Sequence, residues 1–315
     1  MDRMKTINEQ PVSPQEEVLK EIEQAPVRAK DAIGWRVLVR EFAKDRGAVV
    51  CLAILVALLV GIFSVSIFLN QEKILTIDLL KYYMPPSSEN WLGTDSGGRD
   101  ILGQLILGAR NSITIGFSIT LITGVAGIIL GIIAGYYGQM IDNVIMRIVD
   151  FIMILPISMI IIVFVTLIRD YDVFSFVLIM SVFNWVGTAR LIRARALSES
   201  RRDYVSASKT MGTPDWKIMF REIMPNLSSL IIVNLTLRFA GNIGIETGLT
   251  YLGFGLPTSV PSLGTLISYA QSPDILAHRA WVWLPASLLI LVLMISINYV
   301  GQALKRAADV RQRLG

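Results

Sequence analysis

The chain is short of charge, cysteine and histidine, and each shortage excludes a class of protein. Only 17% of its 315 residues are charged whereas 53% are hydrophobic, which is not the balance of a soluble globular domain. The single Cys51 cannot form a disulfide framework or a thiol-rich metal site within one chain. The single His278, beside Arg279 and Trp281, belongs to an interfacial belt. It cannot supply the H-E-x-x-H motif or the Ser–His pair that an intramembrane enzyme needs.

Phosphate-binding and targeting signals are missing as well. No G-x-x-x-x-G-K-[ST] motif occurs, so the chain has no P-loop, and the Gly-rich run at residues 93–98 lacks the lysine. The first apolar run begins too late and is too long for a signal peptide, so we expect it to stay as an anchor. The polar residues before it, 1–46, form a predicted N-terminal arm.

Charge is absent from five long stretches, and these stretches predict the fold class. They are residues 47–71, 111–141, 151–168, 173–189 and 280–304. A bilayer core takes about 20 apolar residues as helix. We therefore predict an all-α membrane protein with a six-helix transmembrane domain at residues 47–304 and a tail at 305–315. The expected spans are 47–69, 113–136, 151–168, 173–189, about 227–249 and 281–303, with a kink at Pro156.

The placement of Lys and Arg predicts the orientation. With both termini in the cytoplasm, nineteen basic residues from Arg28 onward fall on the inner side and six on the outer side. The net charge of +4 then reflects this asymmetry and contact with anionic membrane lipid, not a nucleic-acid partner. Three connections are long enough to carry function: 70–110 and 250–280 outside, and 190–226 inside.

The inner connection contains a predicted helix, a tight break and a second helix. Gly212 suits the position just past a helix end, where a left-handed backbone is easiest without a side chain. Thr213 is then the expected N-cap, Pro214 the first helical residue and Asp215 an acid in the first turn.

The second helix has one apolar face. Its large apolar residues recur at i, i+3, i+4 and i+7, which gives a stripe of Trp216, Met219, Phe220 and Ile223, and Pro225 is expected to end the helix. From the pattern alone, two interpretations stay open. The helix lies flat on the inner leaflet, or it inserts into a groove of a soluble partner.

Four stretches give the chain a family resemblance. Ser206-Ala207-Ser208, Gly212 and Ile223-Met224-Pro225 resemble the cytoplasmic coupling loop of ABC importer permeases, although Ser206 stands where that loop has an acid. Similar motifs of the peptide-transporter branch are WLGTDSGGRD (91–100), AGYYG (134–138) followed by Asp142, Arg147 and Asp150, and ETGLTYLGFG (246–255). Over residues 47–302 the chain is identified as a member of the oligopeptide/dipeptide (peptide/nickel) permeases, and it resembles their C-type subunit.

The resemblance implies an architecture and partners. The fold would be the type I ABC importer permease fold, in the cytoplasmic membrane of a bacterium or archaeon. A second, different permease, two ATPases that bind ATP and Mg, and an extracytoplasmic peptide-binding protein would complete the complex. This chain would be no enzyme, would bind no cofactor or metal itself, and would pass oligopeptides or dipeptides by alternating access. The residues expected to couple to the ATPase are Ala207, Gly212, Asp215, Trp216, Met219, Phe220, Ile223 and Pro225.

Polar groups inside the fifth span form a second candidate site. Asn234, Arg238 and Asn242 repeat every four residues and share one helix face. A charge at mid-bilayer costs at least about 2.5 kcal/mol, so Arg238 is expected to face protein or water. The stripe either lines the translocation path, with Arg238 available to a peptide carboxylate, or hydrogen-bonds to the partner permease. Glu246 is expected to fix the turn at residues 249–257.

The outer motif also keeps two interpretations. Its residues are Gly93, Thr94, Asp95, Gly98, Arg99 and Asp100. They form either a cap that meets the binding protein or closes the outer mouth, or a purely structural turn.

Other transport classes and substrates are weighed against the peptide importer. An ion-coupled secondary transporter would need several intramembrane acids and two repeated halves, and the sequence offers only Glu246. Within the importer class the substrate stays open between peptides, nickel and another small solute, because selection resides largely in the binding protein.

Overall fold

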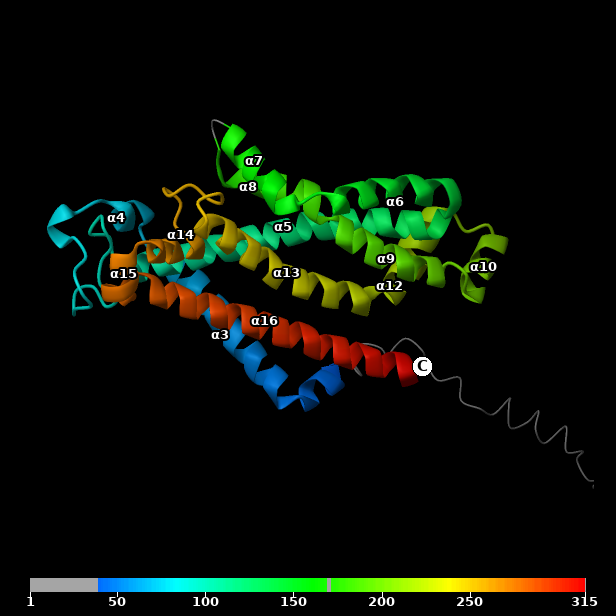
Figure 1. Ribbon diagram of the computed structural model, residues 1–315. Helices are drawn as coiled ribbons and strands as arrows, with labels where there is room; N and C mark the ends of the chain where they lie inside the picture. Colours follow the sequence, from blue (N-terminus) through cyan, green and yellow to red (C-terminus); the bar gives the residue numbers. More distant parts are fainter. Residues whose placement is uncertain (1–38, 169–170, 315) are drawn as a thin grey trace, which may run out of the picture.

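The chain folds as a long bundle of helices (Figure 1). The computed structural model describes residues 39–168 and 171–314, and every regular element in those ranges is helical. Most of the predicted N-terminal arm and Arg169 lie outside the described residues. We call the end that carries α4 (Gln71–Leu75), α14 (Leu263–Ser268) and α15 (Pro273–His278) the outer end, after the predicted orientation. The opposite end, which carries α10 (Asp203–Thr210), is the inner end.

The membrane spans are close to the prediction. Five helices are long and apolar enough to cross a membrane, or six if one bent pair counts as a span, within the described ranges. The five are α3 (Arg46–Phe68), α5 (Ile101–Tyr137), α8 (Val173–Asn184) continued by α9 (Val186–Glu199), α13 (Ser228–Tyr251) and α16 (Ala280–Leu314). The all-α prediction is therefore confirmed.

Two of these helices extend well beyond their apolar stretches. α5 begins at Ile101 because the Asp100 carboxylate accepts the backbone N–H of Gly103 at 2.7 Å and caps the helix. The predicted outer loop 70–110 therefore includes the first turns of α5. In the same way α9 continues to Glu199 and occupies the first part of the predicted inner loop.

The third span is broken rather than kinked. α6 (Gln139–Ile154) and α7 (Ile157–Leu167) meet at a bend of 79°. Pro156 has no N–H to donate, and it disfavours a helical backbone at the residue before it. Leu155 accordingly has an extended ψ of 139°. Residues 139–150, which lie between the second and third predicted spans, form the first three turns of α6.

Glycines bring α5 and α9 into close contact. A Cβ on Gly131 would lie 2.7 Å from the carbonyl oxygen of Ala189, and one on Gly135 would lie 2.7 Å from the Cβ of Ala196. Gly127 is equally tight against Thr188. Small residues let helix backbones approach closely in a membrane. The two helices therefore pack with little space to slide.

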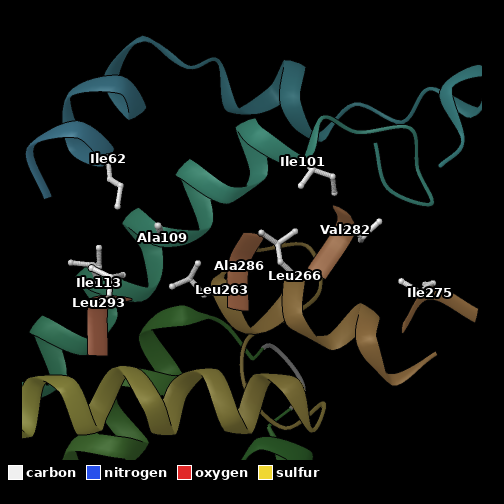
Figure 2. Packing of buried hydrophobic residues seen from close by; sticks show 10 residues of the cluster. All are labelled: Ile62, Ile101, Ala109, Ile113, Leu263, Leu266, Ile275, Val282, Ala286 and Leu293. Carbon is white, nitrogen blue, oxygen red and sulfur yellow. The ribbon is translucent and has the colours of Figure 1, made fainter. Parts of the chain in front are cut away.

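A hydrophobic core lies at the outer end (Figure 2). Side chains from α3, α5, α14, α15 and α16 converge there: Ile62, Ile101, Ala109, Ile113, Leu263, Leu266, Ile275, Val282, Ala286 and Leu293. A second core at the inner end joins α5 and α9 to the helices of residues 203–226. Each end of the bundle thus has its own packed anchor for the loops.

Candidate functional site in the helix pair of residues 203–226

The inner connection folds as a helix pair with a glycine at the break. α10 ends at Thr210, and Gly212 has a left-handed φ of +78° with its backbone N–H donated to the Lys209 carbonyl at 3.0 Å. A Cβ on Gly212 would meet nothing within 4 Å. The backbone at the break is therefore open, and the predicted role of Gly212 at the helix end is confirmed.

The start and the end of the second helix differ from the prediction. α11 (Asp215–Lys217) begins one residue late, with Pro214 in the N-cap position, and Thr213 makes no side-chain cap bond. The helix does not end at Pro225 either. It continues through a π-helical segment, η2 (Ile218–Ile223), and a last turn, α12 (Met224–Asn226). We attribute this to the wider π turn, which accommodates a proline without the usual clash with the preceding turn.

The apolar stripe is divided between the chain's own core and the surface. Met219 and Ile223 are buried against α5 and α9, together with Ile218. Trp216 is 53% exposed, and Met211 is 76% exposed. Of the predicted stripe, Met219 and Ile223 therefore pack within this chain, whereas Trp216 is left exposed. Phe220 is half-buried in the same core.

Met211 and Ile218 were not among the predicted residues. Met211 lies directly before the left-handed glycine, in a turn that has no helical periodicity to mark it. Ile218, the first residue of the π segment, lies off the expected stripe and is buried against α5 and α9. The exposure of Met211 and the burial of Ile218 cannot be predicted from residue spacing alone.

Polar contacts tie the helix pair to the bundle. The Tyr136 hydroxyl at the end of α5 donates to Asp215 Oδ1 at 2.6 Å. The ammonium of Lys209 lies 4.4 Å from the Tyr136 ring centroid, a cation–π contact. Within the pair, the Ser208 hydroxyl donates to Glu222 Oε2 at 2.8 Å. The two helices are thus held both to each other and to α5.

Small and basic residues complete the exposed face of the pair. Ser206 and Ala207 are exposed on α10, on the side away from the buried Val205. Lys217 and Arg221 each place their charge 5.7 Å from the Trp216 ring centroid. We call Ser206, Ala207, Met211, Gly212 and Trp216 the coupling surface.

The polar stripe of α13 is partly used within the chain. Asn242 is buried and donates its amide to the Thr120 hydroxyl at 2.9 Å, so it faces α5. Asn234 accepts from the Thr188 hydroxyl at 3.1 Å. Arg238 is half-buried and lies against Gly187, where an added Cβ would be 1.9 Å from its terminal nitrogen. Among the described residues it has no ion-pair partner.

An open groove runs along a different face of α13. Its volume is about 580 Å³, and its walls include Gly241, Gly244, Gly248 and Met294. A Cβ on Gly241 or Gly248 would meet nothing within 4 Å. Asn242 therefore does not line this groove, and the structure does not place the three polar residues on one open face.

Glu246 is fully buried at the outer end of α13. The Thr250 hydroxyl donates to Glu246 Oε1 at 3.1 Å and accepts the backbone N–H of Leu256 at 3.1 Å. The hydroxyls of Ser112 and Ser262 also lie within hydrogen-bonding reach of the carboxylate. These contacts attach Glu246 to the turn that follows α13, to α5 and to the start of α14.

The outer motif folds around one buried carboxylate. Asp95 accepts the backbone N–H groups of Gly97 at 2.8 Å and Arg99 at 3.0 Å. It also accepts the Arg99 Nε at 2.9 Å, the Gln104 amide at 3.0 Å and the Tyr269 hydroxyl at 3.0 Å. We call Asp95, Arg99, Gln104 and Tyr269 the outer cap. It connects the loop before α5 to α5 itself and to η3 (Tyr269–Gln271), which lies between α14 and α15.

The other residues of the motif are also used internally. Gly93 and Gly98 have left-handed φ values of +73° and +71°, and a Cβ on Gly98 would lie 1.8 Å from the Asp78 carbonyl oxygen. The hydroxyl of buried Thr94 accepts a backbone N–H at 2.8 Å. Asp100 caps α5. Each of these residues therefore has a structural role within the chain.

The described residues hold no cluster of three or more His, Cys, Asp or Glu side chains arranged for a metal ion.

The fold and the projecting helix pair define the class, a multi-pass transport subunit of the kind found in ABC importers. The family model for the binding-protein-dependent transport system inner membrane component matches residues 127–313. The chain belongs to this family, and it is a permease subunit rather than an enzyme.

Curated relatives extend the match over most of the chain. An oligopeptide transport system permease protein OppC of Lactococcus lactis subsp. cremoris is 51% identical over 273 residues, 86% of this chain and 93% of that protein. AmiD of Streptococcus pneumoniae, another oligopeptide transport system permease, is 36% identical over 88% of this chain and 90% of its own length.

A solved structure agrees with the fold. A chain of the MetNI methionine ABC transporter, crystallised in inward-facing conformations, matches with a TM-score of 0.50 and 19% identity. The match covers 66% of this chain and 97% of that chain. At this identity the likeness concerns the fold alone.

Proposed function

We propose that this permease moves oligopeptides or dipeptides inward across the cytoplasmic membrane, by alternating access driven by separate ATPase subunits. The observation that carries the proposal is the coupling surface. Met211 and Trp216 are large apolar side chains left exposed on either side of an open, left-handed glycine. The names of the relatives at 51% and 36% identity supply the peptide as substrate.

The coupling surface suits a groove of an ATPase subunit. Helices that bind in grooves do so through a few large apolar anchors, and exposed apolar groups at the polar end of a membrane bundle mark a contact surface. Ser206 and Ala207 have small side chains, and Gly212 has none, so a partner backbone can approach closely. The buried Met219 and Ile223 have a different role, because they hold the helix pair to α5 and α9.

The orientation follows from the same assignment. The helix pair must lie in the cytoplasm, where the ATPases bind ATP and Mg, and this places both chain termini there as well. The excess of Lys and Arg on that side supports it. A second, different permease would lie beside this one in the membrane, and an extracytoplasmic peptide-binding protein would deliver substrate to the outer end.

Arg238 is the residue proposed for the translocation path. It is half-buried within the span and has no ion-pair partner among the described residues. A peptide carboxylate or carbonyl would satisfy its guanidinium. Asn234 neighbours it and is also half-buried, whereas Asn242 is left out of the path because its amide is bonded to Thr120.

The test is co-purification of the ATPases from detergent-solubilised membranes that contain the whole importer. The variant Met211→Ala/Trp216→Ala removes both exposed anchors, and we expect ATPase recovery to fall at least about tenfold. The matched control is Met84→Ala/Trp91→Ala, which removes an exposed Met and an exposed Trp from the outer loop, away from the helix pair. Equal ATPase recovery with both double variants would overturn the assignment and favour a helix that lies on the inner leaflet.

A further inference from the structure

One aromatic residue contacts both helices of the pair. Tyr136 lies at the inner end of α5, one residue before the helix ends, and is 7% exposed. Its hydroxyl donates to Asp215 in the first turn of the second helix at 2.6 Å. Its ring carries the ammonium of Lys209, from the last turn of the first helix, at 4.4 Å.

The apolar contacts at the same place have a different character. Ile218, Met219 and Ile223 pack against α5 and α9. Apolar burial holds the second helix against α5, but it is not directional. A short hydrogen bond to a carboxylate fixes a distance and an angle. The Tyr136–Asp215 bond therefore sets the register between the helix pair and α5.

α5 is built to carry a displacement over a long distance. It is one helix of 37 residues, about 55 Å long at 1.5 Å per residue. Along its inner half, Gly127, Gly131 and Gly135 pack it tightly against α9. At its outer end Asp100 caps it and Gln104 donates to Asp95 of the outer cap at 3.0 Å. In Figure 1 α5 extends from the outer loops to the neighbourhood of α10.

We propose that Tyr136 is the positioning residue that fixes the helix pair to α5, so that a displacement of the pair is passed along α5 to the outer cap. This inference rests on the proposed function, in which an ATPase moves the helix pair. Tyr136 touches neither the ATPase nor the substrate. Its contribution is the efficiency with which ATP hydrolysis is converted into transport.

The experiment compares Tyr136→Phe with wild type in the complete importer, reconstituted in proteoliposomes. The variant removes one hydroxyl and leaves the ring under Lys209. We expect assembly and ATP hydrolysis to be retained, while peptide transported per ATP hydrolysed falls about tenfold, the effect of losing one charge-assisted hydrogen bond. The matched control is Tyr299→Phe, which removes a Tyr hydroxyl bonded to Asp45, a carboxylate away from the helix pair. The amount of peptide transported per ATP hydrolysed should be unchanged in Tyr299→Phe.

A second set of variants separates positioning from folding. Asp215→Asn keeps an acceptor oxygen for the Tyr136 hydroxyl and should retain most of the transport per ATP, whereas Asp215→Ala should match Tyr136→Phe. The double variant Tyr136→Phe/Asp215→Ala should be no worse than either single one, because the two groups act through one bond. Additive losses, or a normal ratio in Tyr136→Phe, would overturn the proposal.

The two proposals fail differently. If Tyr136→Phe transports normally while Met211→Ala/Trp216→Ala loses the ATPase, the coupling surface stands and the role of Tyr136 is wrong. If the double anchor variant retains the ATPase, the coupling surface itself is wrong, whatever Tyr136→Phe does.

Discussion

Gly212 offers a test in which backbone strain and partner contact can be separated. Its φ of +78° requires the left-handed region, where an ordinary L-residue costs about 1–2 kcal/mol. Asparagine enters this region more easily than other non-glycine residues. A Cβ at Gly212 meets nothing within 4 Å, so neither Gly212→Ala nor Gly212→Asn creates a clash within this chain.

Two possible requirements at Gly212 therefore predict opposite rankings of the loss of activity in Gly212→Ala and Gly212→Asn. If the only requirement is the left-handed backbone, Gly212→Ala is the worse variant, and a strain of about 1.4 kcal/mol leaves roughly a tenth of the competent loop geometry. If an ATPase surface packs against the glycine, Gly212→Asn is the worse variant because its side chain is larger. We expect the second ranking, with Gly212→Asn uncoupling ATP hydrolysis from peptide uptake.

The assay and the control follow from the structure. Peptide uptake and phosphate release are measured together in proteoliposomes that contain the whole importer and its binding protein. Gly253 is the matched control, because it has a left-handed φ of +86° and equally open surroundings at the outer end. Gly253→Asn should leave coupling unchanged. If Gly212→Asn also transports at the wild-type rate, the reasoning that a partner approaches the backbone at Gly212 is refuted.

Three further predictions concern the outer cap and the span. Replacing the buried Asp95 with Asn removes a charged acceptor, so we expect the free energy of local opening at residues 93–101, measured by amide hydrogen exchange, to fall by about 2 kcal/mol. The control Glu89→Gln breaks an exposed ion pair on the same loop and should change this free energy by less than about 1 kcal/mol. Equal effects of the two variants would contradict the buried role of Asp95. Burial, and then the Asp95 charge, raises the pKa of Tyr269 to about 12, so its neutral form is favoured in the fold and the cap should lose stability as the pH rises from about 10 to about 12. Thermal denaturation in detergent across this range should show that loss, and Tyr269→Phe should lack it. Arg238→Ala should reduce uptake of peptides with a free carboxylate more than that of amidated peptides, and normal uptake of both would remove Arg238 from the path.

The helix pair shows where residue patterns succeed and where they fail. The left-handed break at Gly212 depends on local backbone geometry, which the glycine itself makes possible, and it could be predicted. The burial of Met219 and the exposure of Trp216 depend on which side of the second helix meets α5 and α9. That choice is made by packing between segments far apart in the chain, and the π segment shifts it further.

The same contrast holds for the groups inside the membrane. Asn234, Arg238 and Asn242 share a helical spacing, so their common face is a property of sequence. Their hydrogen-bond partners are not a property of sequence, because Asn242 donates to Thr120 of α5 and Asn234 accepts from Thr188 of α9. Likewise the Asp95 carboxylate, in a Gly-rich run, reveals nothing locally of Gln104 and Tyr269, which the fold brings to it.

Sequence by itself determined the membrane class, the all-α fold and the break at Gly212, because these depend on runs of apolar residues and on single backbone positions. It also located Pro156, but only the structure turned an expected kink into a bend of 79° between α6 and α7. Tertiary structure alone decided which apolar side chains remain exposed, which polar groups are satisfied within the chain, and that Tyr136 joins α5 to the helix pair. These outcomes require contacts between distant segments, and hydrophobic patterning, which is local, does not specify them.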